Sequence, residues 1–152
     1  IHGPDGTRIG CGVLTASEDF GTEALLDPYP GVDIKDAPQG RIVLDAANVL
    51  TWELTNLEAS EAFALHIHEG TSCTHSLGHF WDAAYPDPWV EGGKFSSTAA
   101  GNARGMITVG DLEHAYAFEN NVGRVVVVHG PNGARLACGK LLPYVFYFDD
   151  NE

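Results

Sequence analysis

The sequence predicts a single all-β domain, folded as a sandwich of two sheets or as a Greek-key β-barrel. Three observations indicate this fold class. Short apolar or alternating runs recur along the chain, Gly, Asn, Asp and Pro lie between them, and no stretch keeps a helical period over three turns. The length of 152 residues suits one domain that buries a core of its own.

The strands are expected, in chain order, at residues 41–45, 49–55, 61–68, 104–109, 124–129 and 135–142. Between the third and the fourth, residues 80–97 are expected to form one long ordered loop, which holds two of the three tryptophans. We expect Trp81 and Trp89 to pack this loop onto the rest of the domain. A loop of that length inside a compact domain is usually functional.

The first fourteen residues repeat a pattern found near the other end of the chain. Residues 1–14 align without gaps with residues 128–141, and eight of the fourteen positions are identical, His2 with His129 and Cys11 with Cys138 among them. The offset of 127 residues is about the length of one such domain. Chance explains this agreement poorly, and a tandem array explains it well.

The expected domain organisation follows from that repeat. We expect residues 1–14 to be the C-terminal strand remnant of a preceding repeat, which agrees with a chain that opens at Ile1 directly in strand-like sequence. Residues 15–142 would then form the domain, and residues 143–152 would link it to a following repeat. Cys11 would pair within the preceding repeat.

Charge and hydropathy exclude several classes of partner. The formal net charge is −13, whereas binding to nucleic acid needs a basic surface. No apolar run approaches the roughly 18 residues of a membrane span, and the chain does not start with a signal-like segment. The acidity is ordinary for a solvated surface, although a calcium-linked acidic matrix protein is also compatible with this composition.

A His-x-His pair gives the first indication of chemistry. Within residues 61–68, Phe63, Leu65 and Ile67 alternate with His66 and His68. Because side chains of a strand alternate between its two faces, both imidazoles lie on the face opposite the apolar residues. Such a pair is either a pair of surface histidines or part of a metal site, and imidazole suits copper, zinc, iron and nickel alike.

Further motifs accompany this pair in a fixed order. Cys73 is followed six residues later by His79, within Gly-His-Phe; a Gly-Arg-Val-Val-Val-Val-His run ends at His129; and Arg135 begins Arg-Leu-Ala-Cys-Gly. In these motifs the sequence resembles the copper/zinc superoxide dismutases, over roughly residues 20–142. Each motif alone is weak, but the ordered set is specific.

The resemblance implies a site and a disulfide. It assigns the copper ligands to four histidines, His66, His68, His79 and His129. Arg135 is similar to the arginine that holds the superoxide anion beside the metal. Cys73 and Cys138 correspond to the disulfide that ties the ligand loop to the last strand, although two buried free thiols are the alternative. A disulfide implies an oxidising compartment, and we therefore expect an extracellular, secreted protein.

The sequence departs from the zinc-containing enzymes in the loop that follows His79. That loop holds Asp82, Asp87 and Glu91, but no histidine before His114, and a tetrahedral zinc site made of carboxylates alone is improbable. The zinc loop is thus altered, and no zinc is expected. One of the three carboxylates is expected to orient His79, as groups behind a metal ligand commonly do. The sequence does not choose among them.

A second departure concerns the segment between His129 and Arg135. Arg135 follows His129 by only six positions, so the long charged electrostatic loop of the zinc enzymes is absent. Both departures resemble the copper-only branch of the family, which includes tandem-repeat members. The implied function is dismutation of superoxide at a single copper ion, with His79 carrying a proton and Arg135 binding the anion. The alternative is an extracellular copper-binding or structural repeat module with little turnover.

Overall fold

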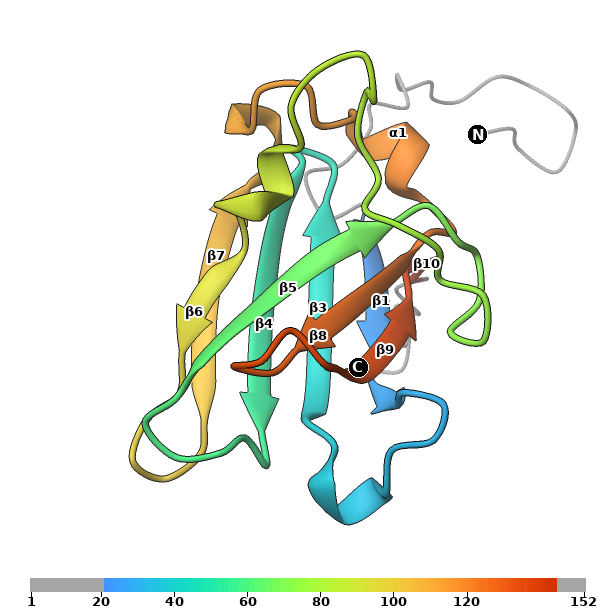
Figure 1. Ribbon diagram of the computed structural model, residues 1–152. Helices are drawn as coiled ribbons and strands as arrows, with labels where there is room; N and C mark the ends of the chain where they lie inside the picture. The colour runs from blue at the N-terminus through green and yellow to red at the C-terminus, as the bar shows by residue number, and fades with distance from the viewer. Residues whose placement is uncertain (1–20, 145–152) are drawn as a thin grey trace, which may run out of the picture.

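The strands of the computed structural model, which describes residues 21–144, form two antiparallel five-stranded sheets that pack face to face (Figure 1). The first sheet has the order β10 (Leu142–Pro143), β1 (Gly21–Leu25), β3 (Gln39–Asp45), β4 (Val49–Thr55) and β7 (Ala103–Thr108). The second has the order β2 (Asp27–Pro28), β9 (Arg135–Lys140), β8 (Val125–His129), β5 (Ala62–His68) and β6 (Lys94–Ser96). The all-β prediction is confirmed in its sandwich form.

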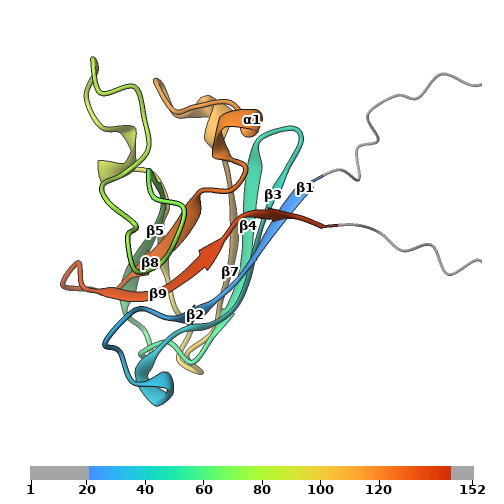
Figure 2. The ribbon, with the colours of Figure 1, turned by 90° about the vertical axis from the view of Figure 1, so that its right-hand side faces the viewer.

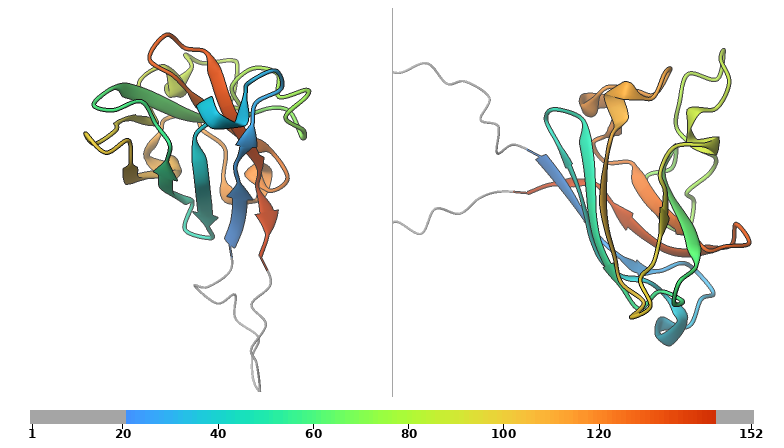
Figure 3. Two further views of the ribbon diagram at one scale, coloured as in Figure 1. Left: turned by 90° about the horizontal axis from the view of Figure 1, so that it is seen from below. Right: turned by 90° about the vertical axis from the view of Figure 1, so that its left-hand side faces the viewer.

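The chain passes repeatedly between the two sheets, and strands distant in sequence therefore become neighbours. β4 pairs with β7, and β5 pairs with β8. This Greek-key arrangement brings the end of β8 beside the middle of β5. Seen from below, β1 and β10 lie side by side at one edge of the first sheet (Figure 3, left).

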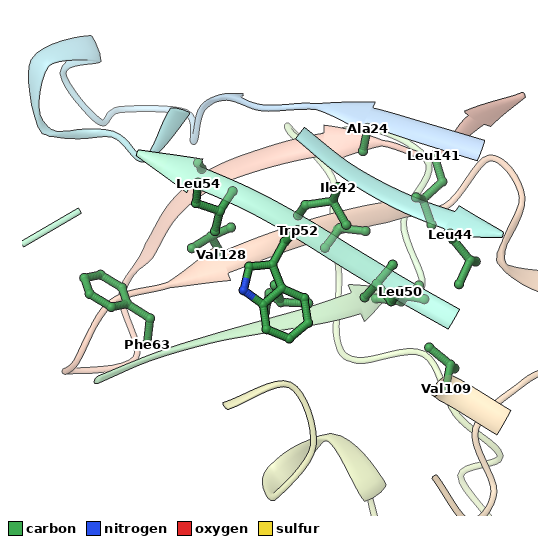
Figure 4. Close-up of a cluster of buried hydrophobic side chains, with 14 of the residues drawn as sticks. Ala24, Ile42, Leu44, Leu50, Trp52, Leu54, Phe63, Val109, Val128 and Leu141 are labelled. Carbon is green, nitrogen blue, oxygen red and sulfur yellow. The ribbon is translucent and has the colours of Figure 1, made fainter. Parts of the chain in front are cut away.

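The core is built by strict alternation in the strands. Ile42 of β3, Leu50, Trp52 and Leu54 of β4, and Val128 of β8 point into the space between the sheets (Figure 4). Each fully buried side chain of this kind contributes roughly 1.5–3 kcal/mol relative to exposure. In β5 the same rule sends Phe63, Leu65 and Ile67 inward and leaves the two histidines on the outer face.

β8 is buried on both faces, which explains its uninterrupted run of four valines. Val126 and Val128 face the core, whereas Val125 and Val127 pack on the outer side against Cys138. Tyr29 and Cys73 cover that outer cluster. Two segments of the chain, one after β2 and one after β5, therefore lie over the outer face of β8.

Long connections gather at one end of the sandwich (Figures 2 and 3). One follows β5 and contains η2 (Pro88–Val90); another follows β7 and contains η3 (Val109–Asp111) and α1 (Phe118–Asn121). They touch where Asp82 N–H donates to the His114 carbonyl at 3.0 Å. A further short turn, η1 (Ile34–Asp36), lies at the opposite end. No helix among residues 21–144 is long and apolar enough to cross a membrane.

Four short strands differ from the sequence prediction. β1 and β2 were not expected, and β6 lies within the predicted loop 80–97, where it pairs with β5. Residues 135–142 form two strands rather than one, because the chain moves from the second sheet to the first at Leu141. Trp89 is buried as expected, and Trp81 packs partly buried against the core.

The expected domain boundaries fall mainly outside the described residues. The predicted remnant at 1–14, including Cys11, and most of the predicted linker at 143–152 lie there. Within the described part, Pro143 belongs to β10 and pairs with Thr22.

Candidate metal centre

Four histidines converge on the outer face of the second sheet. His66 and His68 come from β5, His129 ends β8, and His79 lies in the connection after β5; one ligand nitrogen from each falls within 4.8 Å of the others. Antiparallel pairing of Ala64 with His129 sets the two strands in register. The sequence-predicted ligands are therefore brought together as one cluster.

Backbone hydrogen bonds bring His79 back to the strand. Glu69 N–H donates to the Gly78 carbonyl at 3.0 Å, and Phe80 N–H donates to the Ile67 carbonyl at 2.9 Å. His79 thus forms an isolated antiparallel bridge with His68. The connection behaves locally as a short extra strand, which fixes the position of the imidazole.

Three of the rings, those of His68, His79 and His129, are oriented by a hydrogen-bond partner on Nδ1. His68 Nδ1 lies 3.0 Å from the Leu77 carbonyl, and His129 Nδ1 lies 3.1 Å from the Gly133 carbonyl. Because a carbonyl only accepts, Nδ1–H is the donor and Nε2 carries the lone pair. The Nε2 atoms of His68 and His129 lie 3.2 Å apart. Two lone pairs at that separation are satisfied by a shared cation.

His66 is oriented the opposite way. Its Nδ1 is buried without a hydrogen-bond partner, one of two such side-chain atoms within residues 21–144. The Gly92 carbonyl accepts a hydrogen bond from the same ring. An unpartnered buried acceptor costs about 1–3 kcal/mol. A metal ion bound by His66 Nδ1 and by Nε2 of the other three would remove that cost, so the residues fit a metal.

Burial keeps these imidazoles neutral. It lowers the pKa of His66 to about 3 and the pKa of His68 to about 4, and it also lowers the pKa of His129. The positive charges of neighbouring groups, His79 among them, lower all three further. Since a metal competes with protons for the same lone pairs, these donors are available well below neutral pH.

The centre opens into a groove on the surface of the second sheet. This groove of about 660 Å³ is lined by His66, His79 and His129, with Lys94 of β6 and Pro131 among its other residues. A small solute can therefore reach the histidines from solvent.

Known proteins match the chain in structure rather than in sequence. No protein-family model and no curated protein matches the sequence. A double mutant of a superoxide dismutase-like protein from Bacillus subtilis superimposes with a TM-score of 0.59 at 19% identity, covering 81% of this chain and 98% of that one. Superoxide dismutase 5 of Candida albicans, in its Cu(II) form, gives 0.56 at 18% identity, covering 88% and 97%. The chain has a superoxide dismutase-like fold.

In this superoxide dismutase-like fold, one of the three candidate carboxylates reaches His79. Asp87 Oδ2 accepts a hydrogen bond from His79 Nδ1 at 2.7 Å, and its Oδ1 accepts from Trp89 N–H at 2.9 Å, which caps η2. Glu91 instead pairs with Lys94 at the surface, at 2.7 Å. Asp82, the third candidate, stabilises a local turn, in which its Oδ1 accepts a hydrogen bond from Ala84 N–H at 3.1 Å.

Arg135 starts β9 beside the end of β8 and is held by three groups. Its Nη1 donates to the Tyr29 hydroxyl at 2.9 Å and to the Ser76 hydroxyl at 2.7 Å. Its Nη2 donates to the Leu77 carbonyl at 2.6 Å, the same oxygen that orients His68. The positive charge of the guanidinium acts on His68 and His129, whose pKa values it lowers.

The predicted disulfide is confirmed. Cys73 and Cys138 are bonded, with their Cα atoms 5.7 Å apart. The bond ties the segment that precedes His79 to the middle of β9. The sequence did not identify Tyr29 and Ser76 as partners of Arg135. Tyr29 lies 106 positions from Arg135 in the chain, and no motif links the two residues.

Proposed function

We propose that this chain is a superoxide dismutase that uses a single copper ion without zinc and converts two superoxide anions and two protons into dioxygen and hydrogen peroxide. The observation that carries the proposal is the donor set. Nδ1 of His66 and Nε2 of His68, His79 and His129 are left free to face one another, because other groups of the protein orient each ring. Four imidazoles on a solvent-reachable face suit a redox-active copper.

The choice of one metal is supported by the partner of His79. A second metal bridged by this histidine would have to bind Nδ1, and that nitrogen hydrogen-bonds Asp87 instead. Among residues 21–144 the four histidines form the single group of three or more metal-capable side chains. The likeness to a superoxide dismutase solved with Cu(II) favours copper among the metals that imidazole binds.

Copper bound at this centre would supply the one-electron oxidation and reduction of the two half-reactions. His79 supplies a proton route, because 23% of its side chain is exposed and its Nε2 faces the other histidines. Nε2 can take up a proton only while it is not bound to the metal; Asp87 would then keep its hydrogen bond from Nδ1–H and stabilise the imidazolium. The ring therefore stays in place while it carries the proton.

Arg135 supplies the attraction for the anion. The chain carries a net charge of −13, which does not attract an anionic substrate over long distances. A guanidinium next to the ligands provides a local positive charge and hydrogen-bond donors for a small anion. The positive charge of Arg135 contributes to lowering the pKa of both His68 and His129.

The test is superoxide consumption by protein loaded with one equivalent of copper, measured for the native chain, Arg135→Ala and His79→Gln. The proposal predicts fast turnover without zinc that falls in both variants while Arg135→Ala still binds copper. Tight copper binding with negligible turnover would instead establish a copper-binding or structural module. Binding of calcium in place of copper would favour the matrix-protein interpretation.

The setting of the protein is part of the same proposal. The bond between Cys73 and Cys138 is compatible with an oxidising, extracellular compartment. The pattern shared by residues 1–14 and 128–141 supports neighbouring repeats of the same chain as its structural partners. Superoxide is the proposed substrate.

A further inference from the structure

The hydrogen bonds of Arg135 occupy one whole end of its guanidinium. Both hydrogens of Nη1 are used, one by the Tyr29 hydroxyl and one by the Ser76 hydroxyl. Nη2 gives one hydrogen to the Leu77 carbonyl. Of the five N–H donors of an arginine, the contacts recorded within residues 21–144 leave Nε–H and one Nη2–H for a ligand.

The two hydroxyls that hold Nη1 are themselves fixed. They lie 2.9 Å apart and hydrogen-bond each other, so neither rotates without breaking a second contact. Ser76 is 1% exposed, and it lies in the segment between the disulfide and His79. Its position is therefore set by the same segment that delivers a metal ligand.

Tyr29 is anchored from a different part of the chain. Its backbone N–H donates to the Leu136 carbonyl at 3.0 Å, directly beside Arg135. Its ring packs against the outer cluster of Val125, Val127 and the disulfide. The guanidinium carbon lies 5.6 Å from the ring centroid. Tyr29 thus contacts the guanidinium through both its hydroxyl and its ring.

We propose that Tyr29 and Ser76 are positioning residues that hold the free edge of Arg135 toward the metal centre, so that a small anion is bound there. This inference rests on the proposed function, in that Arg135 is taken as the anion-binding group. Neither residue touches the substrate; each acts through the arginine. The alternative is a purely structural contact that joins the Tyr29 segment to the disulfide segment.

The chain offers a matched set of variants to separate these two roles. Tyr29→Phe keeps the ring that covers the disulfide and removes only the hydroxyl, and Ser76→Ala removes the other hydroxyl. Tyr116→Phe is the control, because the ring of Tyr116 packs against Phe80, with centroids 4.3 Å apart, in the connection between β7 and β8. Each change is made in the native chain and in an Arg135→Ala chain.

The experiment is a titration of the copper-loaded protein with azide, followed by the optical change of the cupric ion. Loss of one charge-assisted contact predicts azide binding weaker by roughly threefold to tenfold in Tyr29→Phe and in Ser76→Ala. Tyr116→Phe leaves the affinity unchanged. In the Arg135→Ala chain, neither hydroxyl deletion has a further effect, because the group through which it acts is gone.

Two results would overturn the inference. One is unchanged azide affinity in Tyr29→Phe with copper fully bound. The other is an equal loss with and without Arg135, which would assign the hydroxyls a structural role. Superoxide consumption is measured on the same samples to test the two proposals separately. If azide affinity depends on the hydroxyls through Arg135 but superoxide is not consumed, only the dismutase function is refuted. If superoxide is consumed but azide affinity does not depend on the hydroxyls through Arg135, only the positioning role is refuted.

Discussion

Removing the disulfide tests how the site depends on its scaffold. The bond joins residues 65 positions apart. For a closed loop of that size the chain-entropy relation gives a stabilisation of about 4 kcal/mol at 25 °C. The variant is Cys73→Ala with Cys138→Ala, which avoids placing a new hydroxyl at the fully buried Cys138. We predict that its free energy of unfolding is lower by about that amount, a large part of the typical total.

The assay is urea denaturation of the metal-free protein, with the chemically reduced native chain as control. The reduced chain and the double variant should unfold together. Copper affinity should also decline in both, because the segment after Cys73 carries the Leu77 carbonyl that orients His68, and then His79. A loss of stability below about 1 kcal/mol would refute the entropic argument. A full loss with unchanged copper affinity would refute the link between scaffold and site.

Three further predictions concern charge. Asp87→Asn should weaken copper binding by roughly tenfold to a hundredfold in a competition titration, because the carboxylate behind a ligand histidine raises its basicity, whereas Glu91→Gln should leave copper affinity unchanged. The metal-free protein should lose stability as pH falls from about 6.5 toward 4, by about 1.4 kcal/mol per pH unit for each of His66 and His68. The reason is that these two histidines become protonated in the unfolded chain but stay neutral when they are buried in the folded protein. A urea midpoint that does not change over this pH range would contradict the prediction. Lys94 lines the groove and pairs with Glu91, so at low salt Lys94→Gln should slow superoxide consumption and Glu91→Gln should speed it. Both differences should disappear above about 0.2 M salt, because salt screens the charges. Effects of the same sign in both variants would exclude a role of this pair in attracting the anion.

Local rules predicted the parts of the fold in which burial alternates. Residues 49–55 were predicted with the observed bounds, because Leu50, Trp52 and Leu54 alternate with exposed residues. β1 escaped prediction because Thr22 and Ala24, though fully buried, carry little apolar surface. β6 is three residues long and exists only because β5 offers it an edge. Neither the burial of these two small residues nor the free edge of β5 can be deduced from the local sequence.

Part of the site could likewise be predicted from local sequence, and part could not. Strand periodicity placed His66 and His68 on one face, whereas His79 and His129 followed from the family resemblance. The choice of Asp87 over Glu91 needed the structure, because it depends on a turn in which one oxygen of Asp87 caps η2 while the other reaches His79. Tyr29 and Ser76 meet Arg135 only through the packing of three distant segments.

The most direct test of the central claim is superoxide consumption as a function of added copper, with zinc removed by chelation beforehand. A dismutase with one copper ion held by the four histidines predicts that activity rises linearly and stops rising at one copper per chain. Added zinc should then change nothing. Activity that appears only after zinc is supplied, or copper that fills the site without consuming superoxide, would contradict the account.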